Sequence, residues 1–345
     1  KTAYEISTRD WSSDVCSSDL DLEPIGENPW SYFLETFEKF GWTISKGDIE
    51  SSFFDVLILN TDSPKALKRA KSIGVKKDNI IFIYWEPSVT VPYIHKIKFT
   101  KQFGKIYTPS RQWTEKLGGV YFYWPQTILT EEIENFHSWE KRSKRGIMVL
   151  GNKFSAGKGQ NYSLRRQIAQ EKITEKQYLI DVYGSQWNKG VLYDFRHYIG
   201  NLRKTALKNI DLKSGNSLGI KHKNYFGEVS NKTETAKKYK INLVIENSPE
   251  YVSEKLFEAH LSQNIVLYVG APLITENFDQ NIAIQCDPSN TNIRNTVLRI
   301  MNLSDRDQYK IMRSQYLIAK KEAKKRFNKK VFQALAKDII NGVSS

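Results

Sequence analysis

Short segments that are apolar at nearly every position recur along this chain, and they constrain its fold more than any other feature. Two of them are 80–84 (Ile-Ile-Phe-Ile-Tyr) and 265–269 (Ile-Val-Leu-Tyr-Val). Strands buried on both faces of a parallel sheet show this pattern, whereas half-exposed strands alternate. Helical patterns separate the segments, which indicates an α/β fold. The predicted strands are 55–59, 80–84, 104–107, 120–123, 147–150, 178–183, 241–245, 265–269 and 282–284.

The length of 345 residues predicts two domains of about 150 residues each. The charged segment 138–145 is interpreted as the linker, between an N-terminal domain at 21–140 and a second domain at 146–303. Residues 304–345 form a basic helical tail. Residues 1–20 are rich in Ser and Asp and have no hydrophobic period, so we interpret them as translated adaptor sequence outside the fold.

The net charge is +14, from 52 basic and 38 acidic residues. Such a chain attracts anions, whether nucleic acid, an anionic membrane or a nucleotide-linked substrate. No run reaches the ~18 apolar residues of a membrane span. Cys16 and Cys286 lie too far apart in sequence for a zinc motif or a disulfide framework, which favours a reducing, cytoplasmic location.

The most informative segment runs from Tyr239 to Leu256, where an apolar strand ends in a polar loop and a helix begins near Ser253. In open parallel sheets, ligands bind outside the carboxyl ends of the strands. Ser253 is a suitable N-cap. Lys255 then lies in the first turn, where the helix dipole disfavours a cation by about 0.3–1 kcal/mol unless an anion binds there. The alternative, of equal weight, is that Glu254 neutralises Lys255 and both are solvated.

The segment from Lys232 to Pro272 closely resembles the donor-binding signature of glycosyltransferase family 10, the α-1,3/1,4-fucosyltransferases. Asp181-Val182-Tyr183-Gly184 also resembles the family's Asp-x-Tyr-Gly strand end, and weaker similarity extends over most of the chain from about residue 50. The resemblance implies a GT-B fold, in which two Rossmann-like domains face each other across a cleft. It places the nucleotide in the C-terminal domain.

The resemblance also implies roles for individual residues. Tyr251, Glu254 and Lys255 match family residues that hold the guanosine diphosphate and the sugar of GDP-fucose. Lys255 would neutralise the leaving diphosphate, and Glu254 would accept hydrogen bonds from donor hydroxyls. Glu246 and Asn247 would orient the donor, or alternatively serve a purely structural role in the loop.

A glycine- and lysine-rich loop at 151–160 suggests a Walker A motif but fails its spacing. Five residues separate Gly151 from Gly157, and Gly159 occupies the Ser/Thr position, so an ATPase is disfavoured. The corresponding region of the fucosyltransferases carries an arginine that contacts the donor diphosphate. Arg165 and Arg166 are the adjacent candidates, and we expect one of the two to face solvent.

Glu86 follows the strand at 80–84, between Trp85 and Pro87, and resembles the family's Glu-x-Pro region with one residue fewer. Inverting transfer needs a base that accepts the proton of the acceptor hydroxyl. Burial against aromatic rings raises a carboxyl pKa toward neutrality, which suits this role. The alternative is a surface carboxylate at a strand end.

No metal site is predicted. Asp305-Arg306-Asp307 matches the Asp-x-Asp pattern of metal-dependent glycosyltransferases, but Ser304 and Asp305 fit a helix cap better. No cofactor is expected beyond the donor substrate, and a divalent metal would at most stimulate the reaction. The basic tail is best interpreted as a solvated helical face. Its alternative is a membrane-surface helix, which the resemblance to bacterial fucosyltransferases also suggests.

Taken together, these features predict an inverting fucosyltransferase that uses GDP-fucose and a glycan acceptor of the lipopolysaccharide, capsule or N-acetyllactosamine type. It would be cytoplasmic, or peripheral at the inner face of a bacterial membrane if the tail binds lipid. One alternative is the same fold with another nucleotide sugar. A basic nucleic-acid-binding protein is the other alternative, disfavoured because the basic residues are spread along the chain and no nucleic-acid motif is present.

Overall fold

The computed structural model describes residues 2–6, 29–45, 53–59, 64–153, 159–187 and 223–343. They divide into two compact units, and each is described by itself. The first unit includes the described residues up to Gln126 and those from Lys324 onward, and the second runs from Thr127 to Ala323. The main sheet of each unit is entirely parallel, which confirms the predicted α/β class.

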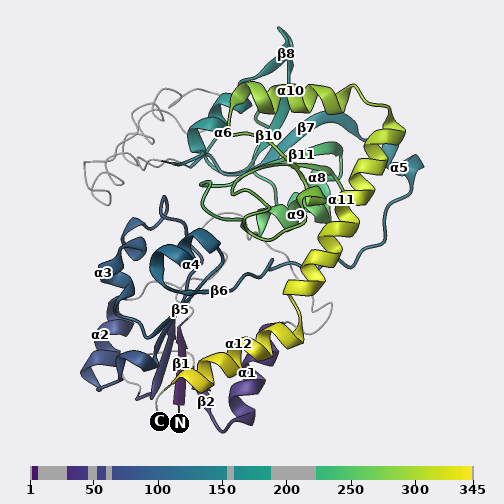
Figure 1. Ribbon diagram of the computed structural model, residues 1–345. Coiled ribbons are helices and arrows are strands. Elements are labelled where there is room, and N and C mark those ends of the chain that lie inside the picture. The colour runs from purple at the N-terminus through teal and green to yellow at the C-terminus, as the bar shows by residue number, and fades with distance from the viewer. Residues whose placement is uncertain are drawn as a thin grey trace. The chain divides into compact units, whose positions relative to one another are not determined.

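The first unit is built on a six-stranded sheet in the order β2-β1-β3-β4-β5-β6 (Figure 1). Strands β3 and β4 are buried at every position, as their apolar sequences predict. The strands are β1 (Thr2–Ile6), β2 (Thr43–Ser45), β3 (Val56–Leu59), β4 (Ile80–Ile83), β5 (Lys105–Thr108) and β6 (Val120–Tyr121). The helices are α1 (Pro29–Lys39), α2 (Pro64–Ser72), η1 (Lys77–Asn79), η2 (Pro92–His95), α3 (Ile97–Thr100), α4 (Arg111–Leu117) and α12 (Lys329–Gly342).

Strand β1 differs from the interpretation of residues 1–20 as sequence outside the fold. It lies between β2 and β3 and pairs in parallel with both. Backbone N–H and C=O groups make this pairing, so the Ser- and Asp-rich composition of the following residues carried no information about Thr2–Ile6. The rest of the 1–20 segment lies outside the described residues.

The second unit has a five-stranded parallel sheet in the order β10-β7-β11-β12-β13 and a small antiparallel β8-β9 pair. Helices α6 and α10 pack together, as do α8 and α9, on opposite faces of the sheet (Figure 1). The strands are β7 (Ser143–Val149), β8 (Lys172–Thr174), β9 (Gln177–Tyr178), β10 (Ile180–Tyr183), β11 (Tyr239–Ile245), β12 (Ile265–Val269) and β13 (Ile284–Gln285). The helices are α5 (Phe136–Glu140), α6 (Tyr162–Ala169), α8 (Lys232–Ala236), α9 (Lys255–Leu261), η5 (Gln280–Ile282), α10 (Asn290–Met301) and α11 (Asp305–Arg326).

All strands of this second sheet are parallel, but the order in which the chain adds them changes direction between β7 and β11. From β7 the chain proceeds to β10 on one side, and from β11 it proceeds to β12 and β13 on the other. Such a topological switch point separates the loops that follow the two central strands, and ligands of open α/β sheets bind there. The loops in question follow Val149 and Ile245.

The predicted linker at 138–145 is part of the second unit instead. Trp139 is fully buried, and its indole N–H donates to the carbonyl of Gln263 (3.1 Å). Arg142 forms an ion pair with Glu134, and β7 begins at Ser143. Lys144 and Arg145 likewise pair with acidic residues of this unit, and the division between the units falls at Gln126 instead.

The basic tail forms two helices. Ser304 caps α11, because its Oγ accepts from the backbone N–H of Asp307 (3.1 Å), and Asp305 accepts from Lys144 and Lys240 (2.9 Å each). These contacts support the structural interpretation of the Asp-x-Asp sequence. Helix α12 lies along α1, and its apolar face is buried there (Figure 1). Every helix in the described part of the chain is too short or too polar to cross a bilayer.

Candidate functional site

The segment that follows β11 brings most of the predicted donor-binding residues to the switch point. Strand β11 ends at Ile245, and α9 begins at Lys255, two residues later than predicted. Glu254 occupies the N-cap position in a helical conformation (φ −55°, ψ −26°) without a side-chain capping bond. The hydroxyl of Ser253 instead accepts from the backbone N–H of Lys255 (3.3 Å). Ser253 therefore still satisfies one of the first free N–H groups of the helix.

Glu246 is fully buried at the end of β11. Its Oε1 accepts from the backbone N–H of Ser253 (2.8 Å), and its Oε2 accepts from the Ser253 hydroxyl (2.7 Å). Burial raises the pKa of Glu246, and the positive charge of Lys255 partly opposes this rise. These contacts tie the loop after β11 to the start of α9, which supports a structural role for Glu246.

Gly270, at the end of β12, is a site residue that the sequence did not single out. A Cβ atom there would lie 2.2 Å from the hydroxyl of Tyr268 and 2.7 Å from Cγ of Glu246. Neither distance is compatible with normal packing, so only glycine fits beside the buried carboxylate. The sequence signal was the glycine that ends an apolar strand, which marks a close approach in an α/β sheet.

The ammonium of Lys255 is held by neighbours on both sides of the loop. It donates to the Ser253 hydroxyl (3.1 Å) and to Oε1 of Glu254 (3.2 Å), and it lies 3.8 Å from Oε2 of Glu246. Burial alone would lower the pKa of Lys255, but the charges of Glu254 and Glu246 outweigh it and the pKa rises. The two carboxylates therefore favour the charged form of Lys255 at this strand end.

The predicted pairing of Glu254 with Lys255 is present, but the pair is not simply solvated. The two side chains are 24% and 20% exposed. Burial raises the pKa of Glu254, and the adjacent Lys255 charge reverses the shift, so its pKa is lowered. A second ion pair, between Lys232 and Glu258 (3.4 Å), lies beside the first and was not predicted. Carboxylates and ammonium groups thus alternate across the start of α9.

Arg165 and Arg166 are both buried, at 2% and 1% exposure, so the expectation that one faces solvent is wrong. Arg165 donates from Nε to the carbonyl of Ile245 (3.1 Å) and from Nη2 to Oδ1 of Asn247 (2.9 Å). Arg166 donates from Nη1 to the carbonyl of Lys153 (2.9 Å). Each guanidinium is thus bonded to one of the two loops at the switch point, after β11 and after β7.

Asn247 and Tyr251 complete the loop after β11. Besides its contact with Arg165, Asn247 accepts at its carbonyl oxygen from the backbone N–H of Asn161, just before α6 (2.9 Å). Tyr251 is only 3% exposed. Its carbonyl accepts from the hydroxyl of Tyr268 (3.4 Å). Most of the Tyr251 side chain therefore packs inside the unit.

Glu86 belongs to the first unit, whereas the other seven predicted site residues belong to the second. It directly follows the loop residue Trp85 at the carboxyl end of β4 and is half-buried. Its backbone carbonyl accepts a hydrogen bond from Nε2 of His95 (2.8 Å). Trp85 stacks on Trp124, with ring centroids 4.3 Å apart. The residue before Glu86 thus belongs to an aromatic stack, and the role of Glu86 as a base stays a prediction.

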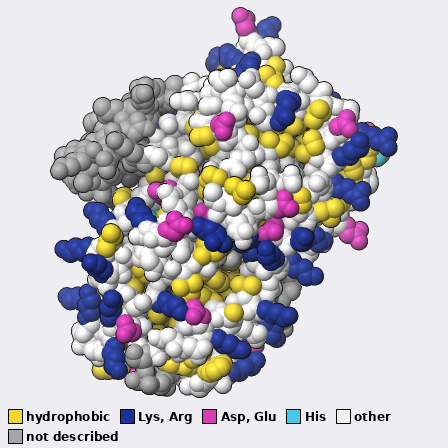
Figure 2. Space-filling model, viewed as in Figure 1, with side chains coloured by type: hydrophobic (Ala, Val, Ile, Leu, Met, Phe, Trp, Pro, Cys, Tyr) yellow, Lys and Arg dark blue, Asp and Glu magenta, His cyan; other side chains and the backbone are white. Residues whose placement is uncertain are grey.

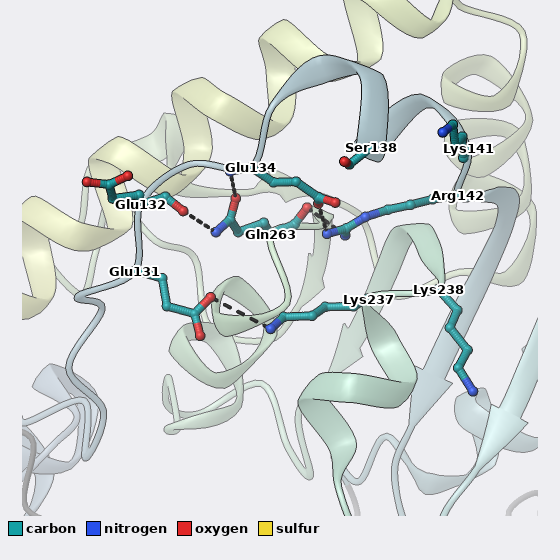
Figure 3. Close-up of a pocket in the computed structure, with 9 residues that line it drawn as sticks. All are labelled: Glu131, Glu132, Glu134, Ser138, Lys141, Arg142, Lys237, Lys238 and Gln263. Atoms are coloured by element: carbon teal, nitrogen blue, oxygen red, sulfur yellow. Dashed lines mark hydrogen bonds and ion pairs between the residues drawn. The ribbon is translucent and has the colours of Figure 1, made fainter.

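A cavity of about 520 Å³ lies at the end of the second sheet away from the switch point, near the amino ends of β7 and β11 (Figure 3). Four of its charged groups form two ion pairs: Arg142 with Glu134, and Lys237 with Glu131 (3.9 Å). The Gln263 amide bridges the Glu132 carbonyl (2.8 Å) and the Glu134 N–H (2.7 Å) (Figure 3). These contacts anchor the segment before α5. The cavity is lined by Glu131, Glu132, Glu134, Ser138, Lys141, Arg142, Lys237, Lys238 and Gln263.

Two other predictions concern phosphate loops and metals. Residues 154–158 of the glycine- and lysine-rich loop lie outside the described residues. Across the residues that the structure describes, no group of three or more His, Cys, Asp or Glu side chains lies close enough together to hold a metal ion.

No family model matches the chain, and no curated protein matches it either. Solved glycosyltransferases share its fold. Anabaena Alr3699/HepE, solved with UDP and glucose, is 9% identical, with 99% of each chain covered and a TM-score of 0.53. An α-glucosyltransferase solved with UDP-glucose and DNA containing an abasic site is 10% identical, with 99% of this chain and 98% of that chain covered and a TM-score of 0.53.

An α1,3-fucosyltransferase is 12% identical, with 99% of this chain and 89% of that chain covered and a TM-score of 0.48. The similarities with TM-scores of 0.53 confirm the predicted GT-B type of glycosyltransferase fold. They do not separate one glycosyltransferase family from another, so membership in family 10 stays a prediction.

Proposed function

We propose that this chain is a glycosyltransferase that transfers fucose from GDP-fucose to a hydroxyl of a glycan acceptor, with inversion at the anomeric carbon. The observation that carries the proposal is the position of Lys255, whose ammonium lies at the start of α9 beside the switch point of a GT-B fold. Diphosphates bind where a cation and free backbone N–H groups meet at a helix start. The choice of fucose rests on the resemblance of the segment from Lys232 to Pro272 to family 10.

In the proposed reaction, the acceptor oxygen forms a bond to the anomeric carbon while the bond from that carbon to the diphosphate oxygen breaks. Glu86 accepts the proton of the acceptor hydroxyl, and GDP departs with the bonding electron pair. Lys255 stabilises the charge that develops on the diphosphate, with Arg165 or Arg166 as a second cation. Because Lys255 already contacts Glu254 (3.2 Å), the diphosphate competes with that carboxylate for the ammonium.

Glu254, once displaced, would accept hydrogen bonds from the sugar hydroxyls. Asn247 and Tyr251 would then contribute through the loop that they stabilise, with Asn247 holding Arg165. We expect no metal ion to be required, because lysine and arginine supply the positive charge that a metal gives other glycosyltransferases. Product formation that survives a chelator would support this expectation.

The direct test is calorimetry of GDP binding to the Lys255→Ala variant, in which we expect binding to be lost. Lys105→Ala is a matched control, because Lys105 is similarly half-buried and pairs with Asp338 (2.7 Å) in the first unit. Undiminished GDP affinity in Lys255→Ala would refute the role of this lysine. Equal losses in both variants would also contradict it, since that result indicates general destabilisation.

A different nucleotide sugar is the second candidate donor, because two of the solved proteins that share the fold were solved with UDP-glucose or with UDP and glucose. Thermal shifts with GDP-fucose, GDP-mannose, UDP-glucose and the free nucleotides would distinguish the donors. We expect the largest shift from GDP-fucose. The acceptor, proposed to be a lipopolysaccharide, capsule or N-acetyllactosamine-like glycan, can be identified by mass spectrometry of the products formed on a glycan array.

A further inference from the structure

Exposed lysines gather on the outer side of α2 and α3 in the first unit, and we call this group the basic face. Figure 2 shows Lys and Arg side chains gathered over these two helices. The end of α2 is linked to the segment after α3, because Lys71 donates to Oε1 of Gln102 (3.0 Å). The basic face consists of Lys68, Lys71, Lys96, Lys98 and Lys101, all of them exposed.

No acidic side chain among the described residues pairs with the basic face. Between Lys65 and Lys101 the sequence has nine Lys and Arg residues but only two acidic ones, Asp78 and Glu86. Within the described part of the chain, none of the five lysines forms an ion pair. Clustered like charges repel one another, so an anionic partner would stabilise the cluster.

Two apolar side chains project beside these lysines. Ile97 is 58% exposed between Lys96 and Lys98, and Tyr93 is 39% exposed. The Tyr93 ring packs edge-on against Phe99, with centroids 5.5 Å apart, so its position is held by the unit. An exposed isoleucine and tyrosine surrounded by lysines match the composition of a surface that inserts shallowly between lipid headgroups.

We propose that the basic face binds an anionic lipid surface. Each lysine near such a surface contributes about a five-fold increase in affinity, and Ile97 and Tyr93 add apolar contact at the depth of the headgroups. A nucleic acid fits the face less well, because the exposed Ile97 between Lys96 and Lys98 has no apolar partner on a phosphate backbone. This surface differs from the basic tail, where the apolar residues of α12 are buried against α1.

The test is sedimentation of the full chain with vesicles of phosphatidylcholine alone or mixed equally with phosphatidylglycerol. We expect binding to the mixed vesicles only. Changing all five lysines to glutamine should abolish it, whereas changing them to arginine should preserve it. Ile97→Ser should weaken it by up to about tenfold. Thermal melting identifies any variant that fails to fold, and the arginine variant keeps the charge if the glutamine variant does not fold.

A charge-matched control changes five exposed tail lysines, Lys321, Lys324, Lys325, Lys330 and Lys337, to glutamine. We expect this variant to bind like the unaltered chain. The proposal is overturned if the unaltered chain ignores phosphatidylglycerol, or if the tail variant loses binding while the basic-face variant retains it. It is also overturned if duplex DNA at the same ionic strength displaces the chain from the vesicles. None of these outcomes depends on the sugar donor, so they are independent of the proposed enzymatic activity.

Discussion

Protonation of His260 should destabilise the second unit in mild acid. His260 lies on α9, the helix that begins with Lys255, and its side chain is fully buried. Burial lowers its pKa from the ordinary value of 6.5 to about 3, and neither ring nitrogen has a hydrogen-bond partner among the described residues. Between these two values the unfolded chain binds a proton that the folded chain does not bind. Stability is therefore lost as the pH falls below 6.5.

The size of the loss follows from the two pKa values. Each pH unit below 6.5 removes about 1.4 kcal/mol of unfolding free energy until the pH approaches 3. At about pH 5 the contribution of His260 is therefore a loss of about 2 kcal/mol relative to neutral pH. Other groups also titrate in this range, so the informative quantity is the difference between the unaltered chain and a variant that lacks the imidazole.

Between neutral pH and about pH 5, the unfolding free energy of His260→Gln should fall by about 2 kcal/mol less than that of the unaltered chain. Urea denaturation followed by tryptophan fluorescence measures the unfolding free energy of each protein at each pH. His137→Gln is the control, because the His137 side chain is 77% exposed, and it should follow the unaltered chain. If His260→Gln and the unaltered chain show the same pH dependence, the buried neutral imidazole cannot be the acid-sensitive group.

Three further predictions concern the site. Gly270→Ala should cost about 1–3 kcal/mol in urea denaturation, because its Cβ would lie 2.2 Å from the Tyr268 hydroxyl; a neutral substitution would contradict the close approach. Ser253→Ala should lower the unfolding free energy by about 1.5–3 kcal/mol in the same assay, since it removes a hydrogen bond to the buried Glu246 carboxylate. It should also weaken GDP binding in calorimetry. An unchanged unfolding free energy would argue against the importance of this hydrogen bond. Glu86→Gln should lower kcat about 10²–10⁴-fold without changing GDP affinity; retained turnover would exclude it as the base.

The carboxylates that contact Lys255 at the start of α9 change the expected mode of donor binding. The sequence left open whether an anion or Glu254 neutralises Lys255, and the structure places Lys255 within 4 Å of two carboxylates, Glu254 at 3.2 Å and Glu246 at 3.8 Å. A diphosphate must therefore outcompete Glu254, which makes donor binding an exchange of partners rather than the neutralisation of a bare charge. This exchange predicts that Glu254→Gln strengthens GDP binding while weakening the recognition of the intact donor.

Local sequence determined the elements that depend on near neighbours. Strands buried on both faces need apolar residues at every position, so β4 and β12 were recognisable from their composition alone. The cap of α11 depends on Ser304 and on a backbone N–H three residues later. A strand followed by a helix start also placed Lys255 at the carboxyl edge of a parallel sheet.

Tertiary structure decided everything that depends on residues distant in the chain. Arg165 is buried because it reaches the carbonyl of Ile245, 80 residues away, and no local pattern encodes that approach. The charged segment before β7 belongs to the second unit because Arg142 finds Glu134 and Ser262 there. A polar or charged side chain is stable inside a protein only when partners surround it, and only the packed fold brings those partners together.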